Sequence, residues 1–390
     1  MERENREISK YLSPNQKAWI RLKKNKSAVA GMIVIAISIF IAIFANLIAP
    51  DKTPNANEQI LEIATEAIGF EMMYLKVPKN TTDNHGMIGK LFNGRENKYQ
   101  FVPVVSYADS GEEITVEKYE GKGRPTKQLS YPKTKIYDTR QQSMEQCFVS
   151  KRYLLGTDKF GRDNLSRIIL GVRISLSVGF LAVLISLLIG ITLGAFAGYY
   201  KKTPPTLSFF GRSFTIPVDD LIMYIINTFW PIPILLLIFA LILALGREFW
   251  QIYLAVGLVM WVEVARVVRG QFLSVREKEF VEAASSLGFS DFRTIFGHVL
   301  PNCMAPIIVI TAANFATAII IEAGLSFLGI GVQPPMPSWG TMLNEYYGYI
   351  GTDKAFLAFI PGFAIMILVL AFNLVGNGLR DALDVRTNIT

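Results

Sequence analysis

The sequence predicts an all-α, polytopic membrane protein with six transmembrane helices and both termini in the cytoplasm. Three observations support this. Hydrophobic types make up 51% of the 390 residues and charged types only 18%, whereas a soluble domain carries about a quarter charged residues. Six segments are apolar enough to cross a bilayer core of about 30 Å, which takes roughly 20 helical residues. Basic residues also gather on one side of these segments, as is typical of cytoplasmic loops.

The expected spans are 28–49, 174–200, 221–245, 249–265, 306–330 and 355–375. The third span contains Pro231 and Pro233, and each should kink it because proline lacks a backbone donor. Kinked helices often line a path through the membrane, but packing alone would explain them equally well. The fifth span carries Glu322, and an intramembrane carboxylate is a candidate functional group.

Glu322 also has a purely structural explanation. If it lies within a turn or two of the outer surface, it would pair with one of the arginines that precede or begin the second span: Arg162, Arg167 or Arg173.

The orientation follows from charge. With both termini inside, the cytoplasmic segments hold eighteen Lys and Arg, whereas the short outer segments 246–248 and 331–354 hold two. We therefore expect a cytoplasmic segment 1–27, a first helix 28–49, a membrane core 151–390 and, within it, a cytoplasmic loop 266–305. Cys147 should lie outside and Cys303 inside, so no intrachain disulfide is expected.

Residues 50–150 differ from the rest. They carry 13 basic and 14 acidic residues and no apolar run of membrane length. Apolar spacing predicts a helix over 58–68, and alternation predicts strands over 99–105 and 113–119. Because structureless loops of this length are uncommon, we expect an extracytoplasmic α+β lobe inserted between the first two spans. The alternative is a disordered hydrophilic loop.

Several kinds of chemistry are excluded. Two cysteines and two histidines cannot form a disulfide framework or a site built on several such ligands. The chain lacks the Walker-type phosphate loop, so it should not bind ATP in the usual way. We expect no catalytic residue, metal site or bound cofactor. The net charge of +7 fits cytoplasmic loops better than nucleic-acid binding.

The most specific segment lies in the loop 266–305. Good helix formers over 277–287 predict a helix, and Gly288 can adopt the left-handed conformation that ends one. Ser290 is a plausible cap for the next turn, with Asp291 favourable inside it, and Pro301 should stop the segment before the fifth span.

Small side chains complete this segment. Ala283 and Ala284, which follow Glu282, would allow another surface to approach closely, and we expect Ala284 to face it. The expected product is a rigid knob on the cytoplasmic face.

This segment resembles a known family. Glu282-Ala283-Ala284, then Gly288, then a spaced Leu300-Pro301 resemble the signature loop of ATP-binding-cassette (ABC) importer permeases. His298 before Leu300 resembles the dipeptide and oligopeptide subfamily. An ordinary amphipathic hairpin is the alternative that Glu-Ala-Ala alone would allow.

Other segments resemble the second permease subunit of peptide importers: 155–163, 166–176, 261–270, 322–329, 337–340 and 379–384. The resemblance is strong over 150–390, weak over 1–50 and absent from 51–150.

The resemblance implies a permease without catalysis in the bacterial inner membrane, forming the path for di- or oligopeptides. It implies a second homologous permease, two ABC ATPase subunits that hold ATP and Mg²⁺, and an extracytoplasmic solute-binding protein. Alternatives are an ABC permease for nickel or another small solute, or a self-contained secondary transporter, which would favour a mid-membrane carboxylate and inverted repeats.

Overall fold

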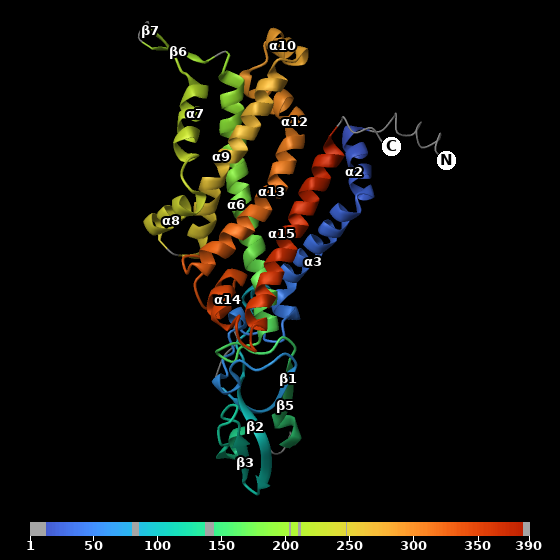
Figure 1. The fold of residues 1–390 in the computed structure, drawn as a ribbon, viewed down its shortest axis with the longest axis vertical. Coiled ribbons are helices and arrows are strands. Elements are labelled where there is room, and N and C mark those ends of the chain that lie inside the picture. Colours follow the sequence, from blue (N-terminus) through green and yellow to red (C-terminus); the bar gives the residue numbers. More distant parts are fainter. Residues whose placement is uncertain are drawn as a thin grey trace, which may run out of the picture. The chain divides into compact units, whose positions relative to one another are not determined.

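A computed structural model describes residues 13–79, 86–136, 144–202, 204–209, 212–246 and 248–384. Most of these residues are helical (Figure 1). The chain forms two compact units. One comprises Met1–Ile37, Ser175–Gly331 and Ile365–Thr390, and the other comprises Ser38–Ile174 and Val332–Ala364.

Within the described residues, five helices are long and apolar enough to cross a membrane: α3 (Lys26–Ile48), α6 (Asn164–Tyr200), α9 (Phe249–Arg276), α13 (Met304–Phe327) and α15 (Phe356–Leu383). A sixth span exists only if α7 (Val218–Phe229) and α8 (Ile234–Leu245), which are bent by 94°, are one span. The polytopic helical class is therefore confirmed, while the count of six stays a prediction.

The predicted third span is interrupted where its prolines lie. Pro231 and Pro233 occupy the break between α7 and α8, and the change of direction is far sharper than a kink. Other ends differ as well. The second span was expected to start at 174 but α6 starts at Asn164, and α9 runs on to Arg276 instead of ending at 265. The expected ends were placed where the apolar run stops. A helix can continue through charged residues, so the observed helices are longer than these runs.

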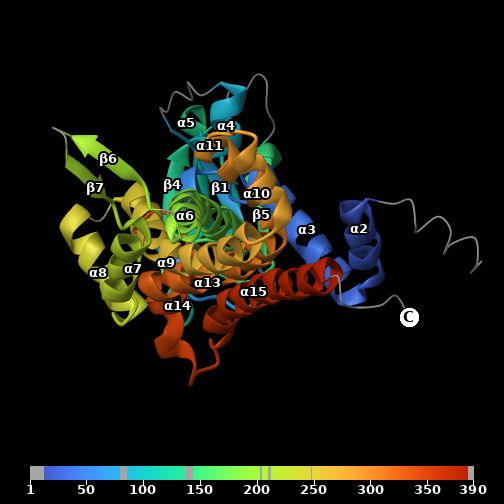
Figure 2. The same cartoon turned by 90° about the horizontal axis from the view of Figure 1, so that it is seen from above.

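The first compact unit is built on closely packed helices. α9 packs against α8 and α13 (Figure 2). Three glycines of α6 face α9: a Cβ at Gly190 would lie 2.6 Å from the Cβ of Val264, and one at Gly198 would lie 2.5 Å from the Cβ of Phe272. One at Gly194 would lie 2.5 Å from a backbone oxygen of α9. Small residues at four-residue spacing let two helix backbones approach closely. This glycine face, Gly190, Gly194 and Gly198, was not anticipated from the sequence.

The second unit contains a five-stranded antiparallel sheet in the order β4-β3-β2-β1-β5. Its strands are β1 (Phe70–Pro78), β2 (Tyr99–Ser110), β3 (Glu113–Lys118), β4 (Lys127–Pro132) and β5 (Phe148–Tyr153). Leu75, Val104 and Ile114 are among the buried residues of its core. The strands predicted over 99–105 and 113–119 are confirmed, and the described part of this segment is not a structureless loop.

The helix predicted over 58–68 is wrong. Only a 3₁₀ turn, Leu61–Ile63, forms there. The backbone amides of Ile60 and Thr65 donate instead to the carbonyls of Phe160 and Asp158, which lie far along the chain. Ile60 and Ile63 are nonetheless buried. The apolar residues therefore hold a non-helical segment in the core of the lobe. The lobe was expected to end at residue 150. It extends further, because β5 runs to Tyr153 and the hydrogen bonds from Ile60 and Thr65 reach residues 158–160.

The remaining elements are short. The α-helices are α2 (Pro14–Lys24), α4 (Met87–Asn93), α5 (Lys133–Ile136), α10 (Glu279–Ser286), α11 (Asp291–Arg293), α12 (Leu300–Asn302) and α14 (Trp339–Tyr346). A π-helical turn, Thr294–Val299, joins α11 to α12. A two-stranded hairpin, β6 (Thr206–Phe209) and β7 (Arg212–Thr215), precedes α7.

Candidate functional site

The segment with the family-like motif folds as a helical hairpin, α10 followed by α11. Gly288 lies between the two helices with φ +78°, a left-handed conformation that is costly for other residues. A Cβ at Gly288 would meet nothing within 4 Å, so conformation alone requires the glycine. The Ser290 hydroxyl accepts a hydrogen bond from the amide of Arg293 at 3.4 Å. The predicted glycine turn and serine cap are therefore confirmed.

Two details of this hairpin differ from expectation. Ala284 was expected to face a partner, but it is buried, whereas Glu282 and Ala283 are exposed. Pro301 was expected to stop the segment, but it lies in α12, which directly follows the π-helical turn Thr294–Val299, and only Cys303 separates α12 from α13.

His298 helps to hold the turn. Its ring stacks on the ring of Phe289, with centroids 5.4 Å apart. The guanidinium of Arg293 also lies over the Phe289 ring, 4.1 Å from its centroid. The Asn302 amide donates to the His298 carbonyl at 2.7 Å. Leu300 packs against the adjoining core.

The base of the hairpin is attached to two membrane helices. Val281, Ile295 and Val299 are buried in one cluster with residues of α6 and α9. The hydroxyls of Tyr199 and Tyr200, at the end of α6, donate to the two carboxylate oxygens of Asp291 at 2.9 and 3.1 Å. The hairpin is therefore fixed to α6 by both packing and hydrogen bonds.

The hairpin also carries exposed apolar side chains. Leu287 is 74% exposed, Phe292 68% and Phe280 39%. We call these three residues the hairpin patch. Large apolar side chains left exposed on one short hairpin are candidates for contact with another molecule. The hairpin patch was not predicted from the sequence, although two phenylalanines and a leucine among the polar residues of a loop were a signal for it.

Glu322 is fully buried in α13. It accepts hydrogen bonds from the hydroxyls of Ser326 at 2.8 Å and Ser175 at 3.4 Å. Asn314, two turns earlier on the same helix, is buried too, and it was not among the residues predicted from the sequence. Serine hydroxyls thus partly compensate this buried carboxyl group, which remains a candidate for the membrane path.

The arginines proposed as partners of Glu322 bind elsewhere. Arg162 pairs with Asp158 at 2.5 Å and with Glu345 at 3.2 Å. Arg167 lies 3.7 and 3.9 Å from the same two carboxylates, and Arg173 donates to backbone carbonyls. Buried charges need such partners, so the Asp158 cluster attaches the start of α6 to α14.

Comparisons with known proteins identify the family of the chain. A family described as "Binding-protein-dependent transport system inner membrane component" matches residues 190–389. Another, "N-terminal TM domain of oligopeptide transport permease C", matches residues 13–62. Residues 63–189, with most of the lobe, lie outside both matches.

Three relatives illustrate the similarity, each aligned over 235 residues and 60% of this chain. A dipeptide transport system permease of Alkalihalophilus pseudofirmus is 43% identical, with 72% of its length covered. A glutathione transport system permease of Pectobacterium atrosepticum is 40% identical, with 73% covered. An oligopeptide transport system permease of Bacillus subtilis is 37% identical, with 72% covered. The chain belongs to the binding-protein-dependent transport inner membrane components, and it is a multi-pass permease subunit of an ABC importer in the bacterial inner membrane.

Proposed function

We propose that this permease forms, together with a second homologous permease, the transmembrane path of a peptide importer. The relatives at 37–43% identity are named for dipeptides, glutathione and oligopeptides, which are all short peptides. Two ATPase subunits would hold ATP and Mg²⁺ inside, and a solute-binding protein would deliver the peptide outside.

One observation carries the coupling part of this proposal: the hairpin has a buried base and an exposed apolar patch, and it lies inside the family match. A surface of this kind fits a groove on an ATPase subunit. Because Asp291 is bonded to the end of α6 and Val281 is packed in the core, a push on the patch would move α6 rather than bend the loop. ATP-driven closure would thereby switch the path between its inward- and outward-facing states.

We place both termini in the cytoplasm, count α7 and α8 as one broken span and place the lobe outside. The inner segments hold eighteen basic residues and the short outer segments hold two, and this asymmetry supports the orientation. In this arrangement Pro231, Pro233 and Glu322 are the candidates for lining or gating the path.

Thiol labelling tests the orientation. Cys147 and Cys303 are both buried, and burial raises the pKa of Cys147, so neither native thiol should react. Lys24 and Lys122 are exposed. With an impermeant maleimide on intact cells, Lys122→Cys should be labelled and Lys24→Cys should not be until the membrane is opened. The unsubstituted chain is the control, and the reverse pattern would overturn the orientation.

Uptake in proteoliposomes tests the activity. With both permeases, the ATPases and the binding protein reconstituted, we expect radiolabelled di- and tetrapeptides to be transported only when ATP is present on the side of the membrane that carries the ATPases. A proton gradient without ATP should give none. Gradient-driven uptake by this chain alone would support a secondary transporter instead, and nickel uptake without peptide uptake would change the cargo.

A further inference from the structure

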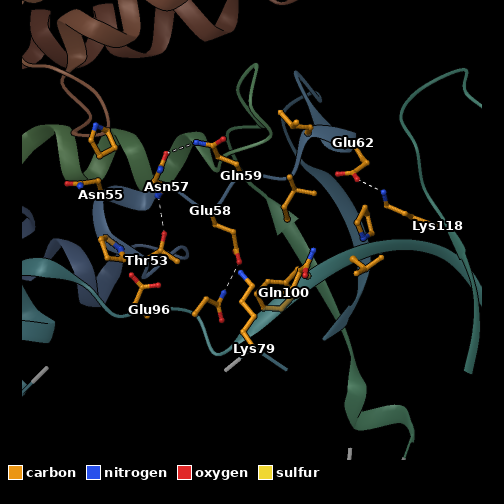
Figure 3. Close-up of a pocket in the computed structure, with 18 of the residues that line it drawn as sticks. Thr53, Asn55, Asn57, Glu58, Gln59, Glu62, Lys79, Glu96, Gln100 and Lys118 are labelled. Carbon is orange, nitrogen blue, oxygen red and sulfur yellow. Dashed lines mark hydrogen bonds and ion pairs between the residues drawn. The ribbon is translucent and has the colours of Figure 1, made fainter. Parts of the chain in front are cut away.

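The lobe contains a cavity of about 780 Å³, formed within the second compact unit (Figure 3). The segment 53–62 forms one side, and residues of β2, β3 and β4 and the chain before β2 contribute others. Pro335, from the loop after α13, also lines it. Small-molecule sites typically have volumes of about 300–1,000 Å³, so the cavity is large enough for a ligand of several residues.

The segment 53–62 is held in an unusual conformation. Asn55 has φ +60° and Ala56 has φ +47°, and Ala56 is fully buried. The Ala56 amide donates to the Thr53 carbonyl at 3.0 Å and the Asn57 amide to the Thr53 hydroxyl at 3.0 Å. Such conformations persist only where the surroundings enforce them, and they cluster at ligand sites.

Two charged groups of the wall are already satisfied. Glu62 pairs with Lys118 at 2.5 Å (Figure 3). Glu58 accepts from Lys151 at 2.9 Å and from Asn97 at 2.7 Å, and burial raises the pKa of its carboxyl group. These pairs fix the wall and are not the groups that a ligand would use.

Three exposed polar side chains of the lining are not committed to partners among the described residues. Among the described residues, the structure gives no side-chain hydrogen bond or ion pair to Lys79, Glu96 or Gln100, and all three are exposed. Within the part of the chain that the structure describes, the cavity therefore offers a cation, an anion and an amide without side-chain partners. A ligand with a single charge would leave one of the ionic groups without a partner. A short peptide with free ends carries an ammonium, a carboxylate and amides between them.

We propose that this cavity binds a short peptide on the permease itself, with Glu96 receiving the ammonium, Lys79 the carboxylate and Gln100 a backbone amide. This inference rests on the proposed peptide transport. The site would be weak, because exposed ion pairs are screened by water. A weak site on the outer lobe would raise the local peptide concentration without retaining the peptide.

Peptide binding to the full chain in nanodiscs, without partner proteins, tests the inference. Saturation-transfer NMR would use tetra-alanine and the same peptide with acetylated and amidated ends. We expect the free peptide to bind at least about tenfold more tightly than the blocked one. Lys79→Gln combined with Glu96→Gln should weaken binding about tenfold, roughly the effect of two exposed charge contacts.

Lys98→Gln combined with Glu112→Gln is the matched control, since both residues are exposed and do not line the cavity. Equal binding to the cavity variant and the control would locate the peptide elsewhere and overturn the site. Absence of binding at millimolar peptide, while the assembled importer still takes up peptides, would overturn the site and leave the transport proposal intact. If the chain binds the free peptide normally but the assembled importer takes up no peptide, the transport proposal would be overturned and the cavity site would stand. A defect confined to capture of the solute-binding protein would assign the cavity to that protein and also overturn the inference.

Discussion

Replacing Leu287 and Phe292 together with serine should detach the ATPase subunits from this permease. Both side chains are mostly exposed, so their loss removes little packing from the chain itself, and exposed substitutions usually change stability by less than about 0.5 kcal/mol. Apolar anchors at the centre of an interface cost about 2 kcal/mol or more each when truncated. We therefore expect the double variant to weaken ATPase binding by about 100-fold or more.

Co-purification of the ATPases with the permease measures this effect, and peptide-stimulated ATP hydrolysis should fall with it. Ile68→Ser combined with Leu154→Ser is the matched control, because these lobe residues are also exposed apolar side chains but lie outside the hairpin. If the hairpin variant retains its ATPases as well as the control does, the hairpin patch is not the contact surface.

The hairpin shows which features a sequence predicts well. The turn at Gly288 and the cap at Ser290 are local, since each depends on one residue and its immediate neighbours. The direction of Ala284 is not local. Successive residues of a helix point about 100° apart, and which of Ala283 and Ala284 is buried depends on what α10 packs against, which here is α9 and the turn Thr294–Val299. The small side chain of Ala284 indicated that another surface packs closely against it, but not whether that surface belongs to a partner or to this chain.

In the lobe, too, local features were predicted correctly and features that depend on distant contacts were not. Strict alternation predicted β2 and β3 because a half-buried strand imposes its period on the sequence. The segment 58–68 has helical spacing, but its amides bond to 158–160, about a hundred positions further along the chain. No local pattern contains that partner. Likewise, no sequence pattern predicted that Lys79 and Glu96 would line one cavity, because they come together only in the fold.

Gly194→Leu should destabilise the membrane core more than any surface change. A Cβ at this position would lie 2.5 Å from the Ala265 carbonyl oxygen and 2.9 Å from the Cβ of Val268. The first of these is a backbone atom, so the clash can be relieved only by moving α6 away from α9. Separation would also break the contacts at Gly190 and Gly198, and overpacking alone costs about 1–3 kcal/mol.

Thermal unfolding in detergent, followed by the loss of the monodisperse peak in size-exclusion chromatography, measures the effect. We expect Gly194→Leu to lower Tm by at least about 5 °C or to prevent recovery of folded protein, since about 1 kcal/mol shifts Tm by roughly 2–4 °C in a chain somewhat smaller than this one. Gly270→Leu is the matched control on α9, because a Cβ there meets nothing within 4 Å and leucine favours helix more than glycine by up to about 1 kcal/mol. The control should therefore equal or exceed the unsubstituted chain. Equal Tm values for the two variants would mean that α6 and α9 are not in backbone contact at Gly194, and that the glycine spacing serves some purpose other than packing.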